Sequence, residues 1–172
     1  MKKFFCFCLA LLMLLLASCG AKSDVPSGMQ DATSAGVSAY SLYVPQTWTV
    51  DTIGVMSMAH HPTDTTCSIS VSEFSAGEDE NDVASYWSNL KEEYAASLPG
   101  FHITGEGSGF LGGKNAGIYS FAVNMGETPV SYQQVISLVG RKVYILTYSA
   151  PTDLYDSHLE DFSSVQTAFV FH

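Results

Sequence analysis

Hydrophobic and polar positions alternate along much of the chain, which predicts several short β-strands. Thr66–Ser72 shows the pattern most clearly, because Cys67, Ile69 and Val71 fall on one face and small polar residues on the other. The same period predicts further strands over residues 39–44, 55–59, 101–111, 117–125, 130–139 and 143–149. The alternation in Thr66–Ser72 places Cys67 on the apolar face. It therefore predicts a buried core thiol, since free cysteine is among the most frequently buried residues.

Two segments follow the helical period instead. Apolar residues recur every three or four positions from Val83 to Leu98, and Pro99-Gly100 follow as a helix stop. A second stripe over residues 154–168 carries Tyr155, Leu159, Phe162 and Val165. The order of strands, helix, strands and helix predicts an α+β fold with a central, mainly antiparallel sheet and helices packed on it.

The start of the chain has the pattern of a targeting segment. Lys2 and Lys3 precede an unbroken apolar run to Leu16, which is shorter than the roughly 20 residues that a membrane-spanning helix needs. This pattern favours a cleaved signal peptide over a retained membrane helix. Leu16-Ala17-Ser18-Cys19 resembles the lipobox of bacterial lipoproteins, and the resemblance implies cleavage after Ser18 and a diacylglyceryl group on Cys19. We therefore expect residues 1–18 to be a signal peptide and the protein to be lipid-anchored at the extracytoplasmic face of the membrane.

The remainder divides into a polar segment and a domain. Residues 19–38 are small, polar and without hydrophobic period, so we expect the lipidated cysteine and a flexible tether there, followed by one domain at 39–172. The formal charge of the whole chain is −10. Without residues 1–18, five basic residues face seventeen acidic ones, which gives −12. Such an acidic protein is repelled by nucleic acid and by anionic lipid, so the lipid anchor must hold it at the membrane.

The domain resembles the PsbP-like family. The matching pieces are Tyr40–Trp48, the Gly112-Gly113 turn before an aromatic strand, the sequence VYILTYSAP and the closing residues 168–171. The resemblance implies an α/β/α sandwich around an antiparallel sheet and a non-enzymatic role in binding or stabilising other proteins. It carries no site motif, so no functional residue is transferred.

Three motifs have the letters of a functional site without its context. Gly107–Gly112 reads GxGxxG, but a strand is predicted after it where a dinucleotide site needs a helix. A nucleophile elbow has glycines two positions before and two positions after its serine, and Ser108 lacks both. The acidic residues 78–82 precede the first helix, and helix capping accounts for them better than a cation site. We therefore expect neither a catalytic residue nor a cofactor.

His60 and His61, with Asp64 and Cys67 close behind, form the one cluster of metal-ligand types in the sequence. Adjacent residues of a strand point to opposite faces, so these side chains should not meet at one ion. We expect a solvent-exposed or edge pair, and His60 and His61 stay weak metal candidates. The sequence thus favours a non-catalytic, membrane-anchored module that binds or assembles a protein partner. The alternatives are a lipoprotein that binds a small molecule or a metal for a transporter and, less favoured, a hydrolase.

Overall fold

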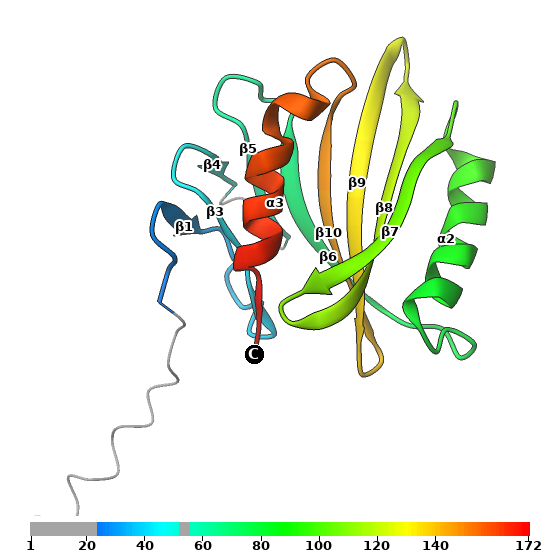
Figure 1. Cartoon of the computed structure of the whole chain (residues 1–172), viewed down its shortest axis with the longest axis horizontal. Helices are drawn as coiled ribbons and strands as arrows, with labels where there is room; N and C mark the ends of the chain where they lie inside the picture. Colours follow the sequence, from blue (N-terminus) through cyan, green and yellow to red (C-terminus); the bar gives the residue numbers. More distant parts are fainter. Residues whose placement is uncertain (1–23, 52–55) are drawn as a thin grey trace, which may run out of the picture.

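The computed structural model describes residues 24–51 and 56–172. Its largest element is an antiparallel sheet of seven strands in the order β4-β5-β6-β10-β9-β8-β7 (Figure 1). The strands are β4 (Thr49–Val50), β5 (Ser57–His60), β6 (Ser68–Ser75), β7 (His102–Leu111), β8 (Lys114–Met125), β9 (Thr128–Val139) and β10 (Lys142–Pro151). The predicted antiparallel sheet is confirmed. Strands β8, β9 and β10 run up to three residues further than predicted, because the hairpin pairing continues up to each turn, whereas β7 matches its predicted range within one residue.

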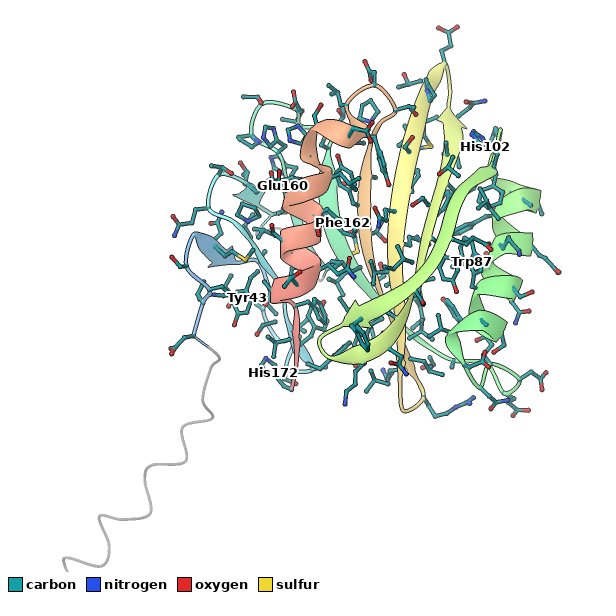
Figure 2. All side chains as sticks on the ribbon, in the orientation of Figure 1. Tyr43, Trp87, His102, Glu160, Phe162 and His172 are labelled. Carbon is teal, nitrogen blue, oxygen red and sulfur yellow. The ribbon has the colours of Figure 1, made fainter. Side chains whose placement is uncertain are left out.

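Helices cover both faces of the sheet. Helix α2 (Val83–Ser97) places Trp87 in a core with Tyr119 and Ile145, whereas α3 (Leu159–Ala168) places Phe162 in a second core with Leu146 (Figure 2). Strand β10 serves both cores, because its alternate residues are buried on opposite faces. The structure is therefore the predicted α/β/α sandwich.

The last helix differs from the prediction. A short 3-10 helix, η2 (Tyr155–His158), precedes α3 where one continuous helix was expected. The chain before and within η2 forms hydrogen bonds from one residue to the residue three positions earlier. Leu154 N–H donates to the Pro151 carbonyl, and Ser157 N–H donates to the Leu154 carbonyl. These bonds wind the chain more tightly than an α-helix does.

The beginning of the domain corrects the predicted boundary at residue 39. Strand β1 (Met29–Asp31) pairs with β3 (Tyr43–Pro45), so the expected tether is already part of the fold at Met29. The predicted strand 39–44 is also divided, because β2 (Tyr40–Ser41) pairs instead with β11 (Val170–Phe171). β1 has no hydrophobic period since its contacts are mainly backbone hydrogen bonds. The predicted signal peptide and Cys19 lie outside the described residues.

The turn between β7 and β8 explains part of the glycine motif. Gly112 has φ 53° and Gly113 has φ 74°, and residues other than glycine rarely adopt these positive backbone angles. A Cβ at Gly112 would also lie 2.6 Å from the Phe171 ring. The predicted turn is thus confirmed. No helix among the described residues is long and apolar enough to cross a membrane.

Candidate functional site

The glycine motif and Cys67 lie where the sequence patterns indicated. Gly107 and Ser108 lie in β7, and the strand β8 follows the glycine motif, as the sequence indicated. Cys67 is fully buried, and burial together with the nearby Asp64 charge raises the pKa of its thiol. Cys67 is therefore a protonated core side chain, which confirms the prediction of a buried thiol.

The acidic segment before α2 caps that helix. The Asp82 carboxylate accepts a hydrogen bond from Ser85 N–H at 2.7 Å, and the Asp82 N–H donates in return to Ser85 Oγ at 3.3 Å. This is a capping box, and the hydrogen bond from Ser85 N–H lowers the pKa of Asp82. Glu80 accepts a hydrogen bond from Gly77 N–H at 2.6 Å, which lowers its pKa as well. The predicted capping role is confirmed.

The same end of α2 forms one wall of an open groove of about 480 Å³, which we call the α2–β7 groove. Its lining residues are Asn81, Asp82, Val83 and Ala84 of the α2 end, Gly107 and Ser108 of β7, Asn115, Ala116, Gly117 and Tyr119 of β8, and Leu138 of β9. The groove thus joins an acidic helix end to an edge of the sheet.

An aromatic stack supports the floor of the α2–β7 groove. The Tyr119 ring lies flat on Trp87, with ring centroids 4.1 Å apart and planes 12° apart. Trp87 Nε1–H donates a hydrogen bond to the Glu106 carboxylate of β7 at 2.9 Å. These contacts tie α2, β7 and β8 together, so the shape of the groove is held by packed side chains.

Strand β7 is an edge of the sheet beside α2 (Figure 1). Among the described strands it pairs with β8 alone. Its sequence, HITGEGSGFL, contains no proline, lysine or arginine, and Phe110 near its end is 64% exposed. Edge strands of this length are templates for a further strand unless charge, proline or a β-bulge blocks them, and the register shift of β7 lies between Ile103 and Gly105, which leaves the regular part from Gly105 onward.

A second cluster lies where the loop after β5 meets the start of α3. His158 Nε2 is 2.6 Å from Asp64 Oδ2, and His61 Nδ1 is 3.5 Å from the same oxygen. The two imidazole rings are stacked, with centroids 4.0 Å apart. The Trp48 ring contacts both imidazoles edge-on, at 5.6 Å from His61 and 6.2 Å from His158. We call His61, Asp64 and His158 the histidine cluster.

The histidine cluster corrects the expectation for the His60-His61 pair. His61 follows the end of β5, so it is not part of the strand as expected, and its side chain is only 18% accessible. His60 stays in β5, opposite Thr49 and Ser68, and is not a member of the cluster. His158 could not be found from spacing, since it lies 94 residues after Asp64. Its place within the apolar stripe of residues 154–168 gave no indication of a ligand.

The sheet with a helix on each face defines a PsbP-like α+β protein. The sequence profile of the DcrB family matches residues 24–167, and the chain belongs to that family. No protein of curated function matches the sequence significantly.

Solved structures with the same fold share little sequence with the chain. PsbP of the cyanobacterium Synechocystis sp. PCC 6803 (CyanoP) is 16% identical with a TM-score of 0.58, covering 91% of this chain and 99% of its own. LpqN of Mycobacterium tuberculosis, which is involved in cell envelope biogenesis, is 18% identical with a TM-score of 0.57, covering 83% and 90%. PA94 of Pseudomonas aeruginosa, a protein of unknown function, is 16% identical with a TM-score of 0.57, covering 79% and 92%. At these identities the likeness establishes the fold.

Proposed function

We propose that the protein is a non-catalytic binding module, anchored by a lipid on Cys19 at the extracytoplasmic face of the membrane. Its partner is a protein that places an extended, basic segment along the α2–β7 groove. The observation that carries this proposal is the acidic groove beside an edge strand that pairs with β8 alone among the described strands.

The edge strand provides the main-chain part of recognition. An extended segment can add to β7 by backbone hydrogen bonds, as in other β-strand additions. The Glu106 carboxylate already accepts the Trp87 indole N–H, so its charge is turned toward α2. Gln166 Nε2 of α3 donates to the Phe110 carbonyl at 3.0 Å, so an added strand would pair with the part of β7 before Phe110. Phe110, which is 64% exposed, offers an apolar contact at the end of the strand.

Charge selects a basic partner. Asp82 lines the groove, and Glu78, Asp79 and Glu80 precede it in the chain. The expected mature chain carries −12, so it attracts basic segments and repels acidic ones. The apolar stem of a lysine or arginine can pack on the Tyr119 ring while its charge reaches the acidic rim.

The available chemistry favours binding over catalysis. The Cys67 thiol is buried with a raised pKa, which removes the thiolate that a nucleophile needs. Both carboxylates of this segment already accept backbone hydrogen bonds, Asp82 from Ser85 N–H as the cap of α2 and Glu80 from Gly77 N–H in the loop before it. Relatives of the same fold include LpqN, involved in cell envelope biogenesis, which supports an envelope role for this chain.

The lipid would place the groove close to the membrane. Nine residues separate Cys19 from β1, so the domain can stand at most about 30 Å from the lipid. Mass spectrometry of the N-terminal peptide tests the anchor. We expect a diacylated Cys19 with residues 1–18 removed, and an uncleaved, unlipidated chain for Cys19→Ala. An unmodified Cys19 in membranes would contradict the anchor and leave the groove proposal to its own test.

Affinity purification from the native membrane tests the groove. Ser108→Arg places a large basic side chain in the groove, whereas Ser164→Arg places the same side chain on the exposed surface of α3. We expect one partner to be retained by wild type and by Ser164→Arg, lost with Ser108→Arg and released by added salt. Equal retention by both variants, or no salt dependence, would contradict the proposed site.

A further inference from the structure

We propose that the histidine cluster is a binding site for a divalent transition-metal ion, with Zn²⁺ as the best-fitting ion. His61 and His158 would supply one imidazole nitrogen each, and Asp64 one carboxylate oxygen. This site is separate from the α2–β7 groove, and neither proposal depends on the other.

The donor atoms are already gathered for a common ion. One ligand atom of each residue lies within 4.8 Å of the other two. Zinc bonds of about 2.0–2.2 Å in tetrahedral geometry place ligands about 3.3–3.5 Å apart. His61 Nδ1 and Asp64 Oδ2 meet that separation at 3.5 Å, and His158 Nε2, now 2.6 Å from Asp64 Oδ2, would move away by about 1 Å.

Nitrogen donors select the class of metal. Two imidazoles with one carboxylate suit zinc, copper, nickel or cobalt, whereas calcium and magnesium take oxygen ligands. Zinc with three protein ligands keeps a fourth position for water. Asp64 is 33% accessible while His158 is 12% accessible, so the carboxylate side of the cluster faces solvent and provides the entry path.

The surroundings hold the ligands in place. Trp48 is buried, contacts both imidazoles edge-on and donates its indole N–H to Asp161 of α3 at 2.8 Å. The Asp64 N–H donates to His61 Nδ1 at 3.2 Å, and Thr63 Oγ1 lies at the same distance, so the loop orients that ring; a metal bound at Nδ1 would replace these hydrogen bonds. A metal bound here would join the loop after β5 to the start of α3 and stabilise the fold.

Calorimetry with Zn²⁺ alone tests the site in the purified mature protein, without residues 1–18 and their two cysteines, after chelator treatment. We expect one ion per chain, a higher melting temperature with Zn²⁺ and no effect of Ca²⁺. His158→Gln and Asp64→Asn should each weaken Zn²⁺ binding at least about ten-fold. His60→Gln and His102→Gln are the matched controls, because His60 lies in β5 and His102 at the start of β7.

Additional measurements separate lost ligands from lost folding. Circular dichroism and the metal-free melting temperature establish that each variant is folded, and Co²⁺ absorption reports the tetrahedral site directly. The proposal is overturned if Zn²⁺ does not saturate at one ion, or if folded His158→Gln and Asp64→Asn bind as wild type does. It is also overturned if His102→Gln weakens binding equally, since that would indicate adventitious surface histidines.

Discussion

Gly117→Ala should destabilise the domain by crowding the floor of the α2–β7 groove. Gly117 lies in β8, and a Cβ there would meet the Tyr119 ring at 2.5 Å from Cε2. The ring has little freedom to move, because it is 8% exposed and stacked on Trp87. The substitution must therefore displace Tyr119, strain β8, or do both.

The size of the effect follows from three contributions. Overpacking a well-packed core costs typically ~1–3 kcal/mol. Loss of an aromatic stack adds ~0.5–1.5 kcal/mol. Alanine recovers ~0.4–1 kcal/mol by restricting the unfolded chain. The net loss is about 2 kcal/mol, which corresponds to roughly 4–8 °C in melting temperature for a domain of this size.

Urea unfolding of matched variants provides the assay. Gly107→Ala makes the same change on the paired strand, where a Cβ has no atom within 4 Å, so its stability should equal or exceed that of wild type. In a double-mutant cycle, Tyr119→Val should abolish the cost of Gly117→Ala. Equal stability of Gly117→Ala and Gly107→Ala would refute the reasoning.

Three further predictions concern the core, the helix cap and the buried thiol. Phe162→Ala should lower the free energy of unfolding by about 3–5 kcal/mol, because the side chain is 1% exposed and stacked on Tyr148; a urea-measured loss below about 1 kcal/mol would contradict this. Asp82→Ala should lower the melting temperature near neutral pH. Since the pKa of Asp82 is lowered on folding from 3.8, its stabilisation is lost as the pH falls below that value, and the difference from wild type should shrink there; a difference independent of pH would contradict the capping account. Cys67 should resist alkylation in the native protein and react in denaturant, as read by peptide mass spectrometry; native labelling would contradict its burial.

The sheet could be predicted because its strands bury alternate residues. Ile69 and Val71 of β6 are buried, as is Cys67 two positions before Ile69, so the period of two in the sequence matches a real buried face. Strand β1 escaped prediction for the opposite reason. It is held by pairing with β3 and by the Gln30 side chain, whose amide donates to the Trp48 carbonyl at 2.6 Å, and backbone contacts leave no hydrophobic pattern.

The two candidate sites depend on contacts between distant parts of the chain. The capping residues before α2 were recognisable, but the groove also requires Ser108 of β7 and Tyr119 of β8 beside them. The histidine cluster joins a loop to the start of α3. Of the four ligand-type residues that the sequence placed together, His60, His61, Asp64 and Cys67, only His61 and Asp64 belong to it. Local patterns therefore predicted the elements, while the sites arose from how those elements pack.

Photo-crosslinking in intact cells tests the central claim most directly, because it reports which surface meets the partner. A photoreactive residue at Ser108 lies in the α2–β7 groove, and one at Ser164 lies on the exposed surface of α3. We predict a crosslink from Ser108 to a lysine- or arginine-rich segment of an envelope protein, weakened by Asp82→Asn, which removes the charge and keeps a capping side chain. Crosslinks to the same partner from Ser164 alone, or crosslinks from Ser108 that ignore Asp82→Asn, would contradict the account.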